Sequence, residues 1–163
     1  SMGKGVEIQS NNIVAITRKK LHSQYKLLNI PDELGEESMK MLSQEPEIKN
    51  TLDYIQKTDV LVFAIGKADE MAKRRKLPED KVNEIISKGA VGEAFGHYFN
   101  ENGEIVYKLN TAGIDLETFK NVEESIAIFA GKRKANALIA LSNINKNIVL
   151  ITDEESAQAI LEQ

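Results

Sequence analysis

The chain has 163 residues, a length that fits one domain with its own hydrophobic core. Its formal net charge of -4 gives no bulk attraction to nucleic acid, and the lack of cysteine excludes disulfides and a thiol nucleophile. No apolar run approaches the roughly 20 residues that a membrane helix needs, and no signal peptide is visible. These absences predict a cytoplasmic protein that has no membrane contact.

The first third of the chain is predicted to be mostly helical. Residues 1–5 are rich in glycine and form a loop at the edge of a domain that covers residues 6–163. The spacing of apolar residues defines the elements that follow. Pro31 ends one of them, and Pro46 begins another. The predicted elements are a helix over Val6–His22, a strand over Tyr25–Ile30, and helices over Glu36–Leu42 and Pro46–Lys57.

The rest of the chain alternates strands with helices, with one interruption. Short apolar runs predict strands that are buried on both faces of a parallel sheet. The predicted elements are strands over Val60–Ile65, 126–130 and Ile148–Ile151, and helices over Ala68–Lys76, after Pro78, over Leu116–Asn121, over 135–141 and after Thr152. Thr152 and Glu155 have the spacing of a capping box. Asn102-Gly103 between apolar runs predicts a β-hairpin. The whole pattern predicts an α/β fold with a mostly parallel sheet and one hairpin insertion.

The segment from Ser125 to Ala140 holds the first candidate site. Its strand ends at Gly131 and leads into a helix that carries Lys134 in its first turn. Free backbone N–H groups beside a lysine can bind a phosphate, although an ordinary turn with solvated lysines has the same pattern. Gly66, Gly131 and Thr152 all follow predicted parallel strands, so their loops are expected at one edge of the sheet.

Other charged groups allow more than one interpretation. The basic run Lys73–Lys76 can bind a phosphate or form a solvated helix face. Glu93, set among small and apolar residues, can accept hydrogen bonds from sugar hydroxyls, act as a base, or face water. His97 alternates with Phe95 and Phe99, which predicts one strand face packed with rings. Neither histidine has a metal-ligand spacing, and no nucleotide-binding or hydrolase motif occurs, so no metal or cofactor is expected.

Three ordered stretches resemble motifs of the sugar-binding domain of SorC-type bacterial transcriptional regulators. They are AVGEAFGHYFNENG at 90–103, FAGKRKANA at 129–137 and LITDEESA at 150–157. MAKRR at 71–75 and EPEIK at 45–49 are similar to the branch of this family that represses glycolytic genes. The likeness covers nearly the whole chain. It implies a Rossmann-like, three-layer α/β domain that is related to sugar-phosphate isomerases and deaminases.

The resemblance also implies a function. It identifies residues 6–163 as the C-terminal part of the effector-binding domain of a glycolytic-gene repressor. The N-terminal DNA-binding domain, and the first strand and loop of the effector domain, are expected to lie outside this sequence. The implied effector is a phosphorylated sugar, which is fructose-1,6-bisphosphate in the glycolytic branch. The implied partners are operator DNA, through the DNA-binding domain, and further copies in a homo-oligomer.

Four residues match ligand-binding positions of the family. Arg74 and Lys134 match phosphate contacts, Glu93 matches a contact to sugar hydroxyls, and Gln9 is a weaker match to a residue on the ligand side. Ala130 replaces the first glycine of the family turn. The alternative is an isomerase-like or deaminase-like enzyme with Glu93 as its base, although no second acid or base and no nucleophile accompany it. A module that only assembles, without a ligand, is a third possibility.

Overall fold

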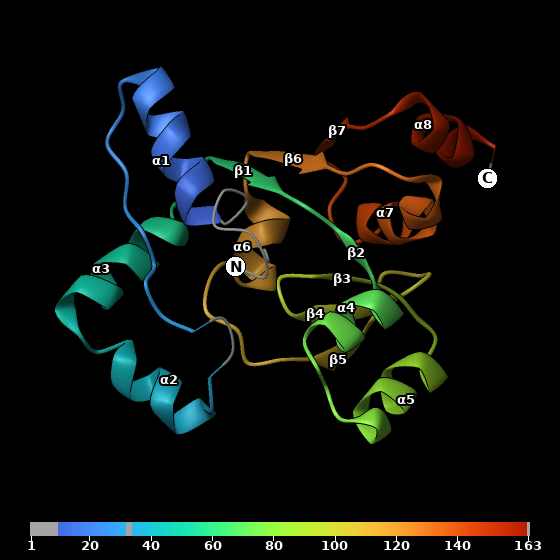
Figure 1. The fold of residues 1–163 in the computed structure, drawn as a ribbon, viewed down its shortest axis with the longest axis horizontal. Coiled ribbons are helices and arrows are strands. Elements are labelled where there is room, and N and C mark those ends of the chain that lie inside the picture. Colours follow the sequence, from blue (N-terminus) through green and yellow to red (C-terminus); the bar gives the residue numbers. More distant parts are fainter. Residues whose placement is uncertain (1–9, 32–33, 163) are drawn as a thin grey trace.

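The computed structural model describes residues 10–31 and 34–162; the prediction for Gln9 lies outside these residues. Two sheets form the centre, with α1–α3 to one side of them and the later helices around them (Figure 1). The helices are α1 (Ser10–Leu21), α2 (Glu36–Leu42), α3 (Pro46–Ile55), α4 (Ala68–Arg74), α5 (Glu79–Ser87), α6 (Leu116–Asn121), α7 (Ala135–Ser142) and α8 (Glu154–Leu161), with a 3-10 turn, η2 (Lys132–Lys134). The strands are β1 (Val60–Phe63), β2 (Gly66–Lys67), β3 (Ala90–Ala94), β4 (His97–Asn100), β5 (Ile105–Lys108), β6 (Glu124–Ile128) and β7 (Ile148–Ile151).

The first sheet is parallel and has the order β1-β6-β7, which confirms the predicted α/β class. Side chains alternate between its faces, so Phe63 and Ala127 point into the core. Val62, Ile128 and Ile151 lie on the other face and remain exposed. The described residues cover only one face of this sheet. For this part of the chain, the prediction that the strands are buried on both faces is therefore wrong.

The second sheet is antiparallel and has the order β2-β3-β4-β5. It contains the predicted hairpin between β4 and β5, with Gly103 at a φ of 81°. The insertion is larger than one hairpin, because β3 also turns directly into β4. Phe95 and Gly96 form that turn, so the prediction that Phe95 shares a strand face with His97 is wrong.

Three aromatic rings form the centre of the larger core. Phe63, Phe95 and Phe119 contact one another with centroids 5.1 to 5.5 Å apart, at tilted or edge-on angles. A second, smaller core lies under α4 and α5 and is built around Tyr98 and Ile85, both fully buried. The first core joins the parallel sheet to the antiparallel one.

The N-terminal third differs most from its prediction. The strand predicted over Tyr25–Ile30 is wrong, because this segment is irregular and pairs with no described strand. Its side chains contact helices instead: the Lys26 ammonium lies 3.8 Å from the ring centroid of Tyr54. Ile13 and Leu21 of α1 are exposed, so the described chain does not bury the predicted apolar face of this helix. No described helix is long and apolar enough to cross a bilayer.

The cap of α8 also differs from the predicted capping box. The hydroxyl of Thr152 donates to the carbonyl oxygen of Phe129 at 2.8 Å, so it is used in joining two loops. Asp153 caps the helix and accepts a hydrogen bond from the Ser156 backbone N–H at 2.8 Å.

We expect Phe119→Ala to lower the free energy of unfolding by about 3–5 kcal/mol, because it removes a fully buried ring from the aromatic cluster. Urea unfolding followed by circular dichroism measures this change. Leu161→Ala is the control, since that side chain is 86% exposed and its loss should change stability little. Equal stability of the two variants would contradict the assignment of Phe119 to the core.

Candidate functional site

The loops that follow the parallel strands meet at one edge of the sheet, as predicted. The backbone N–H of Phe129, after β6, donates to the carbonyl of Ile151, at the end of β7, at 3.2 Å. The backbone N–H of Gly131 donates to the Asp153 carboxylate at 2.9 Å. The η2 turn lies beside β2, which follows the end of β1. This edge is where ligands bind in open parallel sheets.

The glycine turn forms as expected, with one difference in detail. Gly131 has a φ of 98°, a conformation that favours glycine. One 3-10 turn then precedes α7, so Lys134 is the N-cap residue of α7 rather than part of its first α-helical turn. Its side chain is therefore placed where the backbone N–H groups of α7 begin.

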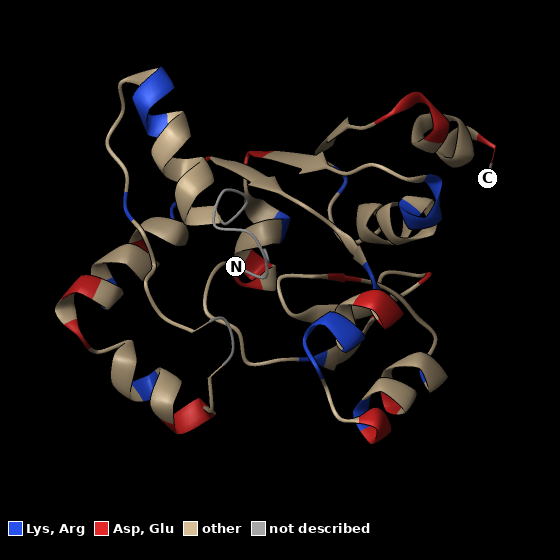
Figure 2. Ribbon diagram, in the orientation of Figure 1, with Lys and Arg blue, Asp and Glu red and all other residues tan. Residues whose placement is uncertain are grey.

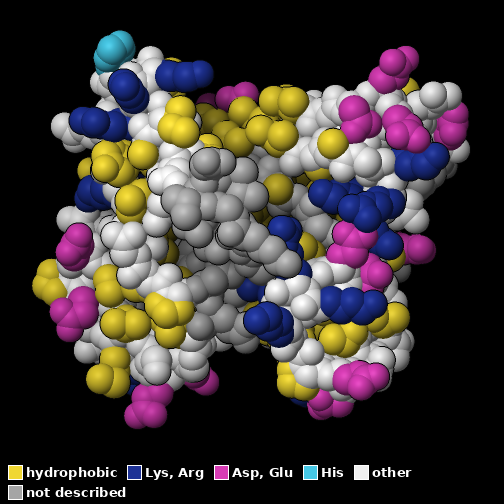
Figure 3. Space-filling view, viewed as in Figure 1, with side chains coloured by type: hydrophobic (Ala, Val, Ile, Leu, Met, Phe, Trp, Pro, Cys, Tyr) yellow, Lys and Arg dark blue, Asp and Glu magenta, His cyan; other side chains and the backbone are white. Residues whose placement is uncertain are grey.

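Two of the three η2 cations already have a carboxylate partner. Lys132 Nζ lies 3.0 Å from Glu155 of α8, and Arg133 Nη1 lies 3.0 Å from Glu70 of α4. Figure 2 shows the basic η2 segment just before α7, near the acidic start of α8. Lysine and arginine side chains gather over this region in the space-filling view (Figure 3).

Arg74 and Lys134 differ from these paired cations. Neither makes an ion pair within 4.0 Å with any residue of 10–31 or 34–162. Arg74 is exposed in the last turn of α4, and Lys134 is half-buried. Both charges are consequently available to an anion.

Glu93 is buried in β3, so the alternative in which its carboxylate faces water is wrong. The preceding Gly92 faces α7, where an added Cβ would lie 2.9 Å from Ala137. Glu93 points to the opposite side of the strand, where its Oε1 accepts hydrogen bonds from the Gly96 backbone N–H at 2.7 Å and from Arg75 Nη2 at 3.2 Å. A buried carboxylate is thus held by a cation and an amide.

The β3–β4 turn that supplies the Gly96 N–H has an unusual backbone. Phe95 and Gly96 have positive φ values, 54° and 79°, as required at both central residues of a common type of two-residue hairpin turn. Positive φ is costly for a bulky residue, and here the Phe95 ring packs against Phe63 and Phe119. Its carbonyl accepts a hydrogen bond from the Thr111 hydroxyl at 3.0 Å. Packing and hydrogen bonding together hold the strained turn beside Glu93.

Sequence reasoning selected Arg74 and missed Arg75, which is the arginine that contacts Glu93. The helical periodicity of α4 distinguishes Arg75 from Arg74. Ala68 and Ala72 are buried on one face, and Arg75 continues that face at i+7, whereas Arg74 does not. Gln9 lies outside the described residues, so its position stays a prediction.

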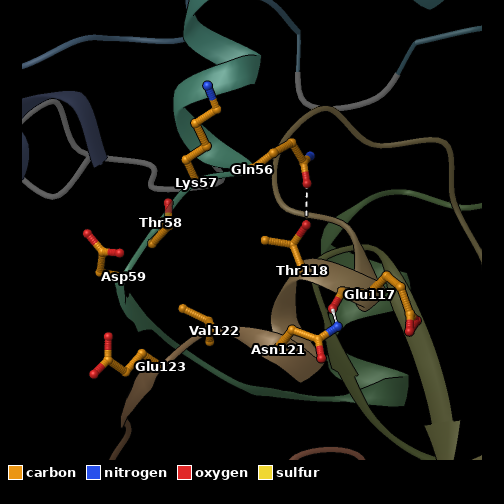
Figure 4. A pocket seen from close by; sticks show the side chains of 9 residues that line it. All are labelled: Gln56, Lys57, Thr58, Asp59, Glu117, Thr118, Asn121, Val122 and Glu123. Atoms are coloured by element: carbon orange, nitrogen blue, oxygen red, sulfur yellow. Dashed lines mark hydrogen bonds between the residues drawn. The ribbon is translucent and has the colours of Figure 1, made fainter.

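Two cavities lie near the ends of the parallel strands. A groove of about 670 Å³ opens at their amino ends, where the labelled side chains of Asp59, Glu117 and Glu123 surround it (Figure 4). Lys57 is the one lysine or arginine among the residues that line this groove. The groove would therefore bind a phosphate poorly. A smaller cavity of about 180 Å³ borders Arg75. Its other lining residues are Phe95, Thr111, Ala112, Gly113 and Ile114.

Two titratable groups near the site have shifted pKa values. Burial lowers the pKa of His97, whose Nδ1 lies 3.1 Å from the Phe95 carbonyl. The pKa of Asp153 is lowered by hydrogen bonds from Ser156 and then from the Gly131 N–H. Within the described residues no group of three His, Asp or Glu side chains could hold a metal ion.

Comparison with known proteins defines the class to which this fold and site belong. A family model described as "Putative sugar-binding domain" matches residues 1–162, so the chain belongs to this sugar-binding domain family. The central glycolytic genes regulators of Priestia megaterium and Bacillus subtilis are 40% and 36% identical to it over 160 residues. The alignments cover 98% of this chain and 47% of either relative, so the chain spans about half the length of these regulators.

Solved structures agree with this family. A SorC family transcriptional regulator from Enterococcus faecalis has a TM-score of 0.85 at 38% identity, over 98% of this chain and 65% of its own. The full-length sorbitol operon regulator SorC of Klebsiella pneumoniae shares the fold at 18% identity, with a TM-score of 0.85 over 96% of this chain and 52% of its own. The resemblance to SorC-type regulators inferred from the motifs is confirmed, and these relatives are named as regulators rather than enzymes.

Gly96→Ala tests the strained turn. An alanine there pays about 1–2 kcal/mol for positive φ, and its Cβ would also lie 2.6 Å from Thr111. Gly89→Ala is a matched control, because Gly89 has a φ of 76° but nothing within 4 Å of an added Cβ. We expect Gly96→Ala to lose about 1–3 kcal/mol more than Gly89→Ala in urea unfolding. Equal losses would show that the turn does not press on Thr111.

Asp153→Asn tests the link between the β6 and β7 loops. Because the pKa of Asp153 is lower in the folded state, its stabilisation is present above the usual value of 3.8 and is lost as pH falls through the folded pKa. The variant should therefore be less stable than wild type at pH 7, and the difference should shrink progressively as the pH falls below 3.8. Thermal unfolding across this range measures it.

Glu154→Gln serves as the control for this pH series, since the exposed Glu154 carboxylate makes no comparable hydrogen bond among the described residues. A constant difference between wild type and Asp153→Asn at every pH would contradict the proposed role of the carboxylate charge.

Proposed function

We propose that this chain is the effector-sensing part of a bacterial repressor of glycolytic genes, and that it binds a phosphorylated sugar, fructose-1,6-bisphosphate. One observation carries the proposal. Arg74 on α4 and Lys134 on η2 have no carboxylate partner among the described residues, and α4 packs against β3, which carries the buried Glu93. The names of the regulators that share this family support the same conclusion.

The residue chemistry suits a ligand that has phosphates and hydroxyls. Arg74 offers a planar fork that can bind two phosphate oxygens, and Lys134 adds a point charge at the start of α7. The ionised Glu93 carboxylate can accept hydrogen bonds but cannot donate them. It can therefore bind a sugar hydroxyl, which donates, but not a phosphate oxygen. Gln9 is proposed as a further contact on the ligand side.

The proposed mechanism is linkage between ligand binding and assembly or DNA binding. A ligand that prefers one conformational state shifts the population toward that state, and a shift from 1:99 to 99:1 needs about 5.5 kcal/mol of differential binding. Operator DNA would be bound by a separate DNA-binding domain of the cytoplasmic regulator, which we propose acts as a homo-oligomer.

The chemistry of Glu93 gives no support to the enzymatic alternative. A general base must take a proton, whereas Glu93 receives donors from Arg75 and Gly96 that stabilise its ionised form. The relatives found by comparison are regulators. A buried, cation-held carboxylate is better suited to recognising hydroxyls than to accepting a proton.

Isothermal calorimetry with fructose-1,6-bisphosphate tests the proposal. We expect wild type to bind and Lys134→Ala to bind at least about tenfold more weakly, because one charge-assisted phosphate contact is lost. Lys146→Ala is the control, since that exposed lysine follows the opposite end of α7. Absence of heat with wild type would overturn the proposed ligand, and unchanged affinity in Lys134→Ala would remove that lysine from the site.

A further inference from the structure

Arg75 and Glu93 form a nearly buried ion pair beside the proposed ligand site. Their side chains are only 8% and 4% exposed, and Nη2 of Arg75 lies 3.2 Å from Oε1 of Glu93. Replacing such a buried pair with apolar residues is often neutral or stabilising in other proteins. Its presence is therefore poorly explained by stability alone, and a role in recognition is the better explanation.

Rigid elements fix both partners of this pair. Arg75 is the C-cap residue of α4, and its backbone N–H donates to the Met71 carbonyl at 2.9 Å. Glu93 lies in a central strand of the antiparallel sheet, opposite Gly66 on β2. The same carboxylate oxygen is also held by the Gly96 N–H of the strained turn. Helix end, strand and turn consequently determine where the Glu93 carboxylate points.

We infer that Arg75 is a positioning residue: it holds Glu93 in one orientation, as a carboxylate, so that Glu93 can accept hydrogen bonds from the hydroxyls of a sugar phosphate. This inference rests on the proposed function. Arg75 does not itself bind phosphate, because its guanidinium is turned inward toward Glu93, while the adjacent Arg74 is exposed. A cavity of about 180 Å³ borders Arg75 on the side of Phe95 and Thr111.

The inference predicts a loss that depends on the kind of ligand. Without Arg75, Glu93 loses the cation that holds its carboxylate in one orientation. Binding through sugar hydroxyls should weaken, whereas binding of a bare phosphate through Arg74 and Lys134 should not.

Calorimetry on the full chain with two probes tests this inference. The probes are fructose-1,6-bisphosphate, which carries hydroxyls, and inorganic pyrophosphate, which lacks a sugar. Arg75→Met should bind the sugar bisphosphate at least about tenfold more weakly and bind pyrophosphate as wild type does. Lys73→Met is the matched control, because it removes an exposed charge from the same basic run and should bind both probes normally.

A second measurement reads the carboxylate directly. The Gly96 amide in a ¹H–¹⁵N spectrum reports on its hydrogen bond to Glu93. In Arg75→Met the chemical shift of this amide should differ from wild type, because the carboxylate that accepts its hydrogen bond is no longer held by a guanidinium. Arg75→Lys, which keeps the charge but loses the planar guanidinium, should fall between wild type and Arg75→Met in affinity.

The outcomes separate the inference from the proposed function. If wild type does not bind fructose-1,6-bisphosphate, the proposed function is wrong. If wild type binds and Arg75→Met and Arg75→Lys bind as tightly as Lys73→Met, the function stands and the positioning role is wrong. Equal losses for both probes would show a general structural effect and would also overturn the inference.

Discussion

Parallel pairing of β1 with β6, and of β6 with β7, is the constraint on which the site depends. It puts the carboxyl ends of three strands at the same edge, although nearly 90 residues separate the first from the last. Hydrogen bonds between the loops after β6 and β7 then fix their relative position, with Asp153 bonded to both its own helix and the Gly131 turn. A ligand at this edge would therefore contact loops that cannot move independently.

Charge pairing decides which side chains at this edge are free to act. Lys132 and Arg133 tie η2 to α8 and α4, and these exposed pairs contribute little stability singly. They do orient the turn that carries Lys134. The buried pair of Arg75 and Glu93 has the opposite character, because burial makes an unpaired charge costly. The candidate site thus combines a carboxylate held in place by an ion pair with two cations, Arg74 and Lys134, that have no carboxylate partner among the described residues.

The described chain also leaves an apolar surface uncovered. Val62, Ile128 and Ile151 on the sheet, and Ile13 on α1, are exposed, although parallel sheets are usually covered on both faces. The family relatives are about twice as long as the aligned region. Local periodicity predicted that these residues face a core, but periodicity cannot say which segment supplies the other side of that core.

The sequence by itself determined the class of the fold, the family, and the glycine turn before α7, because these depend on local spacing and on short motifs. It could not separate Arg74 from Arg75, or place the Phe95 turn, because adjacent residues in a basic or aromatic run look alike until packing selects a face. Tertiary structure also decided that Asp153 caps α8, since the hydroxyl of Thr152 is used by a strand end 23 residues away. Contacts between distant segments compete with local preferences, and only the folded chain shows which of them wins.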